Sequence, residues 1–125
     1  AILFWTFNLF SLMMMESRKQ AEVAREQAEQ ANRELRALQD LMRDLYEDAD
    51  KERGVPSTVA WLTEELGELA QAVRKGDIDQ QTHEIADVLA WLASLANQLN
   101  IDLDEAIMRF ANGCAKCEES PCTCS

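Results

Sequence analysis

Residues 64–87, EELGELAQAVRKGDIDQQTHEIAD, predict two helices joined by a tight turn. Gly76 is placed to end the first helix in the left-handed conformation, and Asp77 or Asp79 can cap the second. Each helix carries one apolar face, formed by Leu62, Leu66, Leu69 and Val73 before the turn and by Ile85, Leu89, Leu92 and Leu99 after it. We therefore expect helices over about 58–75 and from the turn to about 99, packed as an antiparallel hairpin with these faces inward.

The segment before the hairpin predicts one long helix. Residues 16 to about 50 contain no glycine or proline, and apolar residues alternate steps of three and four at Ala21, Ala24, Ala28, Ala31, Leu35, Leu38, Met42 and Leu45. Alanines can pack only weakly, so residues 16–34 are expected to form a helical arm, and the leucine half to begin a domain over 35–112. Gly54 and Pro56 should stop this helix, and Ser57 or Thr58 should cap the next.

The segment after the hairpin predicts one more short helix and a cysteine-rich end. Asp102 and Glu105 give a D-x-x-E start for the helix, and no stretch alternates strictly enough for a strand. The predicted fold class is all-α: a helical bundle built on an antiparallel helix hairpin, with a long N-terminal helical arm. Residues 113–125 should form a small cysteine knuckle.

The first fifteen residues, AILFWTFNLFSLMMM, carry no charge. At about 1.5 Å per residue they fall short of the roughly 30 Å hydrocarbon core of a membrane, and they lack the basic start of a signal peptide. Three explanations remain open for them: a fragment, upstream translation before a start near Met13 to Met15, or a truncated membrane anchor.

The overall charge limits the classes of binding partner, and the positions of the cysteines limit the cellular compartment. A net charge of −11 argues against nucleic acid or an anionic membrane as a partner and favours a metal cation. All four cysteines lie in the last twelve residues, which is unlike a disulfide framework spread through a secreted fold. We therefore expect a reducing, cytoplasmic setting.

Four carboxylates should converge on one level of the hairpin. Glu65 and Glu68 are spaced three apart, as are Glu84 and Asp87, and the two pairs lie at similar distances from the turn. Burying so many like charges without compensation would cost several kcal/mol each. Mg²⁺ prefers oxygen ligands and keeps positions open for water and phosphate, so it would compensate them. The alternative is a solvated acidic face.

The same residues resemble a known family. EELGE, followed fifteen residues later by EIAD, resembles the E-E-x-x-E…E-x-x-D signature of the MazG-like all-α nucleoside triphosphate pyrophosphohydrolases. The resemblance spans roughly residues 35–124, including LQDLMRDLYEDADKERG, DVLAWLASLANQLNIDLDEAI and a cysteine-rich end found in some members. It implies cleavage of an NTP or dNTP between its α- and β-phosphates with Mg²⁺, or Mn²⁺ as a substitute, giving a monophosphate and pyrophosphate.

The resemblance also implies a homodimer or tetramer, nucleotide-pool housecleaning, and roles for single residues. Glu65, Glu68, Glu84 and Asp87 match the family's metal ligands. Glu64 matches the residue that orients or deprotonates the attacking water, against the alternative of an exposed helix residue. Two rival functions stay open: a phosphoribosyl-ATP pyrophosphohydrolase, and a non-catalytic metal-binding oligomerisation adaptor.

Candidates for substrate binding lie near these carboxylates. Trp61 and Trp91 each sit one helical turn from a metal ligand and could stack on a nucleobase, or else pack between helices or subunits. Arg74 and Lys75 could reach a phosphate, or else complement the dipole at the end of their helix. Lys51 and Arg53, in the loop before the metal helix, are equally open.

The four cysteines form a C-x2-C-x4-C-x-C pattern: Cys114, Cys117, Cys122 and Cys124. Four thiolates without a further ligand suit a closed, structural Zn²⁺ site. Two disulfides, free thiols in a frayed tail, or an iron–sulfur cluster are the alternatives.

Overall fold

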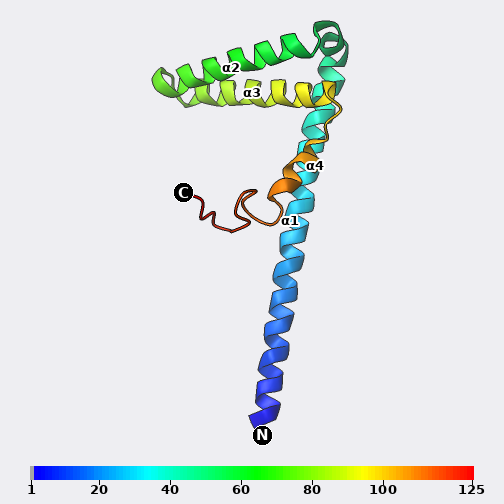
Figure 1. The fold of residues 1–125 in the computed structure, drawn as a ribbon, viewed down its shortest axis with the longest axis vertical. Coiled ribbons are helices and arrows are strands. Elements are labelled where there is room, and N and C mark those ends of the chain that lie inside the picture. Colours follow the sequence, from blue (N-terminus) through cyan, green and yellow to red (C-terminus); the bar gives the residue numbers. More distant parts are fainter. Residues whose placement is uncertain (1) are drawn as a thin grey trace. The chain divides into compact units, whose positions relative to one another are not determined.

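The computed structural model describes residues 2–125, while the side chains of Ala28, Ala31 and Asn32 lie outside the described set (Figure 1). Its elements are α1 (Ile2–Arg53), α2 (Val55–Lys75), α3 (Ile78–Gln98), α4 (Leu103–Ile107) and the 3₁₀ helix η1 (Met108–Phe110). No strand occurs among residues 2–125, so the all-α prediction is confirmed. The chain divides into two compact units, one up to Arg33 and one over Glu34–Ser125.

The first unit is the N-terminal part of α1, which starts at Ile2 and not near Glu16. The apolar run contains no glycine or proline, so nothing in it interrupts the helix. Its large apolar side chains are exposed, Phe4 by 72%. Among the described residues, no helix is long and apolar enough to cross a membrane. Ala21 and Ala24 are exposed, and the seam positions Ala28 and Ala31 lie outside the described side chains.

The second unit is built on the antiparallel hairpin of α2 and α3 (Figure 1). A capping box starts α3: the backbone N–H of Gln80 donates to Asp77 Oδ1, and the N–H of Asp77 donates to Gln80 Oε1, both at 3.0 Å. Asp77 is therefore the cap, and Asp79 is not. Gly76 is extended, with φ −91° and ψ 177°, so the predicted left-handed end of α2 was wrong. Glycine is needed there because a Cβ would lie 2.8 Å from the carbonyl oxygen of Ala72.

The predicted break before α2 is confirmed at Gly54, which has φ 80°. The helix nevertheless begins at Val55, because Pro56 falls in its first turn, where a backbone N–H would have no helical acceptor. Thr58 donates its hydroxyl to the carbonyl oxygen of Gly54 at 3.0 Å, within the helix. The predicted cap at Ser57 or Thr58 was therefore wrong.

Small side chains take the most buried positions of α2 and α3. Ala72, Ala93 and Ala96 are buried, and Thr58 is fully buried. The larger residues predicted to face inward are exposed by 44–63%, namely Leu66, Val73, Ile85, Leu89, Leu92 and Leu99. The prediction was wrong for these six, because small side chains take the most buried positions of the two helices and the wider leucine faces are left uncovered.

Polar contacts attach the C-terminal part of α1 to the hairpin. Gln39 is buried, and its amide nitrogen donates to Asn97 Oδ1 at 3.2 Å and to the carbonyl oxygen of Ile101 at 2.9 Å. Gln98 donates to the carbonyl oxygen of Asp50 at 3.0 Å and to Thr58 Oγ1 at 2.9 Å. These hydrogen bonds hold the C-terminal end of α1 beside the start of α2 and the end of α3.

The predicted helix start at Asp102 is confirmed in α4. The side chain of Asp102 accepts the backbone N–H of Asp104 at 2.8 Å. Arg36 pairs with Asp102 at 2.6 Å and with Asp104 at 3.1 Å, which holds α4 against α1 within the second unit.

Candidate metal centre

Three carboxylates of the hairpin come together. Glu65 on α2 and Glu84 and Asp87 on α3 each offer an oxygen atom, and these atoms all lie within 4.8 Å of one another. All three side chains are half-buried. The short turn and the antiparallel packing place them at one level, as counting outward from the turn predicts.

Two oxygen atoms of this group lack any partner. Glu65 Oε2 and Glu84 Oε2 are buried and accept no hydrogen bond among the described residues. A buried carboxylate oxygen without a partner is unfavourable unless a cation or a donor reaches it. Hard oxygen donors from two facing helices suit Mg²⁺, so the residues present fit such an ion.

The electrostatics of the group point the same way. Burial raises the pKa of Glu65 above its ordinary value, and the charges of Glu68, Asp87 and Glu84 raise it further, while a hydrogen bond from Trp91 lowers it. Negative charge is thus concentrated around Glu65, and a divalent cation would relieve it.

Glu68, the fourth predicted ligand, is exposed and lies outside the three-residue group. It borders a cavity of about 350 Å³ beside that group, together with Glu84 and Lys75. Lys75 is therefore placed next to the carboxylates. Arg74 is exposed and donates to the carbonyl oxygen of Ala70 in its own helix at 3.4 Å.

Glu64 and His83 flank the group on its two helices. Glu64 is exposed, and its side chain makes no hydrogen bond or ion pair in the described part of the chain. His83 Nε2 lies 3.2 Å from Asp87 Oδ2. The four-residue spacing of His83 and Asp87 on one helix face was the available signal for this contact, and the sequence reasoning missed it.

An aromatic stack connects the carboxylates to the start of α2. The rings of Trp61 and Trp91 are nearly parallel, with centroids 6.0 Å apart and an angle of 12°. Trp91 Nε1 donates to Glu65 Oε1 at 3.1 Å. The guanidinium of Arg53 lies 4.7 Å from the centre of the Trp91 ring and pairs with the buried Asp50 at 2.6 Å. Trp91 is therefore held by three contacts, whereas Trp61 is 46% exposed.

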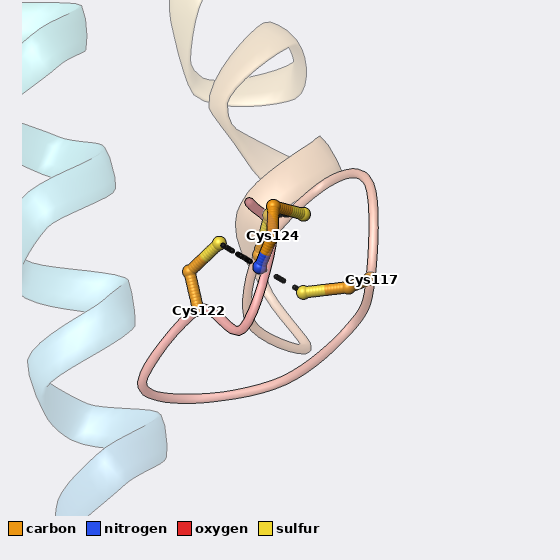
Figure 2. A group of neighbouring side chains, drawn as sticks. Cys117, Cys122 and Cys124 are labelled. Carbon is orange, nitrogen blue, oxygen red and sulfur yellow. Dashed lines mark hydrogen bonds between the residues drawn. The ribbon is translucent and has the colours of Figure 1, made fainter.

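A second cluster lies at the C-terminal end. The sulfur atoms of Cys114, Cys117, Cys122 and Cys124 all lie within 4.8 Å of one another, and none forms a disulfide. Figure 2 shows Cys117, Cys122 and Cys124 gathered within one loop. Backbone N–H groups of Glu119 and Thr123 lower the pKa of Cys117 to about 5. Hydrogen bonds with Cys117 and Cys122 raise the pKa of Cys124 to about 11.

Comparison with known proteins identifies one matching family. The model of the MazG nucleotide pyrophosphohydrolase domain matches residues 53–119, which is more than half of the chain. The matched region contains α2, α3 and the acidic residues Glu64, Glu65, Glu68, Glu84 and Asp87, and ends before Cys122 and Cys124. No curated protein matches the chain.

Proposed function

The chain belongs to the MazG nucleotide pyrophosphohydrolase family, and on this premise we propose that it hydrolyses a nucleoside triphosphate, NTP or dNTP, between the α- and β-phosphates. The products are a monophosphate and pyrophosphate, and Mg²⁺ is the required ion. The observation that carries the proposal is that Glu65, Glu84 and Asp87 each place an oxygen within 4.8 Å of the others, while Glu65 and Glu84 each also have a buried oxygen without a partner among the described residues.

The half-buried carboxylates and the exposed Glu68 are proposed to bind the ion together. Glu65, Glu84 and Asp87 would hold the ion, and Glu68 would complete the set from the neighbouring cavity. A bound Mg²⁺ supplies positive charge that neutralises phosphate oxygens. The ammonium group of Lys75, on the rim of the same cavity, adds a second positive charge for the phosphates.

Glu64 is the proposed general base. It is exposed and has no competing partner among the described residues, so its carboxylate is free to accept the proton of the attacking water. The water oxygen bonds to phosphorus, the bridge between the α- and β-phosphates breaks, and pyrophosphate leaves. A carboxylate used in this way would stay outside the set of metal ligands.

The base of the nucleotide is proposed to stack on Trp61. Its ring is partly exposed, while Trp91 is committed to Trp61, Arg53 and Glu65. Stacking tolerates any base, since every base presents a π face.

A screen of NTPs, dNTPs and phosphoribosyl-ATP with Mg²⁺ tests the reaction, by measuring pyrophosphate against orthophosphate. Pyrophosphate should appear with an NTP or dNTP. Glu64→Gln should lower turnover by about 10²–10⁴-fold with Mg²⁺ binding retained, as expected for a lost general base. Glu65→Gln should lose both turnover and Mg²⁺ binding. Asp79→Asn, a matched carboxylate change on α3 away from the group, should lose neither.

The alternatives predict different products. Turnover of phosphoribosyl-ATP alone would assign the chain to that reaction. Release of orthophosphate would refute cleavage between the α- and β-phosphates. Mg²⁺ binding without turnover of any nucleotide would favour the non-catalytic adaptor.

A further inference from the structure

The cysteine cluster lies outside the carboxylate centre, and the proposed reaction does not use it. We infer that Cys114, Cys117, Cys122 and Cys124 bind one Zn²⁺ through four thiolates in a closed tetrahedral site, which holds the C-terminal segment in place. Zn²⁺ here is a structural ion and a different metal from the one at the hairpin.

The sulfur–sulfur distances carry the inference. Cys114 Sγ lies 3.8 Å from Cys124 Sγ, and Cys117 Sγ lies 3.9 Å from Cys122 Sγ. A tetrahedron with Zn–S bonds of about 2.3 Å has edges of about 3.8 Å. The two measured pairs share no atom, so they correspond to two opposite edges of such a tetrahedron. A disulfide would require about 2.05 Å, and neither pair approaches that distance.

The backbone around the sulfurs is folded to bring them together. Gly113 has φ 119°, and a Cβ there would lie 2.8 Å from the carbonyl oxygen of Glu118 and 2.9 Å from that of Glu119. The N–H of Glu118 donates to the carbonyl oxygen of Cys114 at 2.8 Å, and the N–H of Cys114 donates to that of Glu119 at 3.0 Å. This tight turn accompanies the approach of Cys114 and Cys117 to within 4.8 Å of the last two cysteines.

Backbone N–H groups also point at the sulfurs. The N–H of Lys116 lies 3.4 Å from Cys114 Sγ, and the N–H of Cys124 lies 3.3 Å from Cys122 Sγ. Hydrogen bonds of this kind stabilise negative charge on sulfur and orient metal-bound thiolates. The dashed line to Cys122 in Figure 2 follows the second of them.

The donor set selects the metal and its role. Four soft thiolates favour Zn²⁺ over the hard Mg²⁺. With four protein ligands no coordination position is open for a substrate, so the ion is structural. The ion would hold residues 113–125 in place, because this segment contains no helix or strand and no buried side chain. A segment with so few contacts needs another source of order.

Metal analysis of the full-length chain tests the inference. After purification with Zn²⁺ and removal of unbound metal, we expect about one zinc per chain. Cys114→Ser and Cys122→Ser should each lose it, while Ser125→Ala, next to Cys124, should keep it. Glu65→Gln should also keep it, so the result does not depend on the proposed reaction. Replacement by Co²⁺ should give the visible absorption of tetrahedral thiolate coordination.

A second measurement covers variants that misfold. Far-UV circular dichroism reports on α1, α2 and α3 and should be unchanged in the cysteine variants, because these helices lie outside the loop. Trypsin should cleave after Lys116 more than tenfold faster once the zinc is chelated. Four titratable thiols with no zinc bound, two disulfides detected by mass, or iron with inorganic sulfide would each overturn the inference.

Discussion

Glu65 combines burial, repulsion and a hydrogen bond in one side chain. Its pKa is raised, first by burial and then by Glu68 and Asp87. A raised carboxyl pKa has a consequence between the pKa of Glu65 in the unfolded chain and its pKa in the folded chain. In that pH range the folded chain holds a proton that the unfolded chain has lost. The stabilisation is complete below the unfolded pKa of about 4.3 and is lost as the pH rises through the folded pKa.

This sign gives a prediction for the metal-free protein. With a chelator present, the melting temperature of the wild type should fall relative to that of Glu65→Gln as the pH rises from about 4.3 toward neutrality. Thermal melts over that range measure the difference, and Glu22→Gln on the exposed arm is the control. Parallel curves for the wild type and Glu65→Gln would refute the assigned cause. Adding Mg²⁺ should raise the wild-type melting temperature and leave that of Glu65→Gln unchanged.

Trp91 supports Glu65 from the opposite helix. Trp91→Phe keeps an aromatic ring against Trp61 and Arg53 but removes the N–H that donates to Glu65 Oε1. Loss of a partner that orients a metal ligand lowers metal affinity by about 10–100-fold. Titration calorimetry with Mg²⁺ should detect this decrease in Trp91→Phe and little change in Trp61→Phe. Equal losses in both variants would show that stacking, and not the hydrogen bond, is what matters.

The sequence predicts the convergence of carboxylates better than their individual contacts. Counting from the turn places Glu65, Glu84 and Asp87 at one level because helix geometry and antiparallel packing are regular. Glu68 lies three residues after Glu65 on the same helix but outside the group, and the hydrogen bond from Trp91 to Glu65 was not predicted. Both depend on the rotation of each helix and on side-chain rotamers, which spacing does not determine. The assignment of these residues as ligands stays a prediction.

At the scale of elements, the capping box of α3 is the clearest local determinant. Asp77→Ala removes the acceptor for the N–H of Gln80, and loss of such a cap costs about 1 kcal/mol. Urea unfolding should show this decrease in stability. Asp79→Ala is the matched control, because it removes a charge from the same turn without removing a cap. A larger loss in Asp79→Ala would mean that charge near the helix start outweighs the cap.

The elements themselves follow from periodicity, while their ends and their contact faces do not. The hairpin and the break at Gly54 were predicted from helical spacing and from glycine and proline. The cap at Ser57 or Thr58 was wrong because proline is accepted in the first turn of a helix. The leucine faces were misassigned because spacing does not determine which part of a broad apolar surface is buried, and here the buried positions are small residues such as Ala72 and Ala93.

At the scale of the whole molecule, the uncovered leucine faces are the main feature. Leu66, Ile85, Leu89 and Leu92 are each about half exposed in the single chain. Large apolar side chains exposed on neighbouring helices are typical of an interface between subunits. We therefore expect a homodimer, or a tetramer, assembled through the hairpin of α2 and α3.

Deleting residues 1–33 tests where the assembly interface lies. This removes the first compact unit and leaves the second, Glu34–Ser125, intact. The alanines of the predicted seam bury little area, so at about 25 cal/mol per Å² this seam contributes little to a dimer. The truncated chain should remain a folded, active dimer by light scattering and pyrophosphate release. A monomer, or an inactive dimer, would show that the arm helps to build the assembly or the site.

The connection between α2 and α3 consists of Gly76 and Asp77 alone, and its length fixes the phase of one helix relative to the other. One inserted residue that adopted helical conformation would rotate the residues after it by about 100° and move them by about 1.5 Å along the helix. Glu84 and Asp87 would then turn away from Glu65, although both helices could still form. Related sequences that retain this centre should therefore vary in the residues of the turn more readily than in their number.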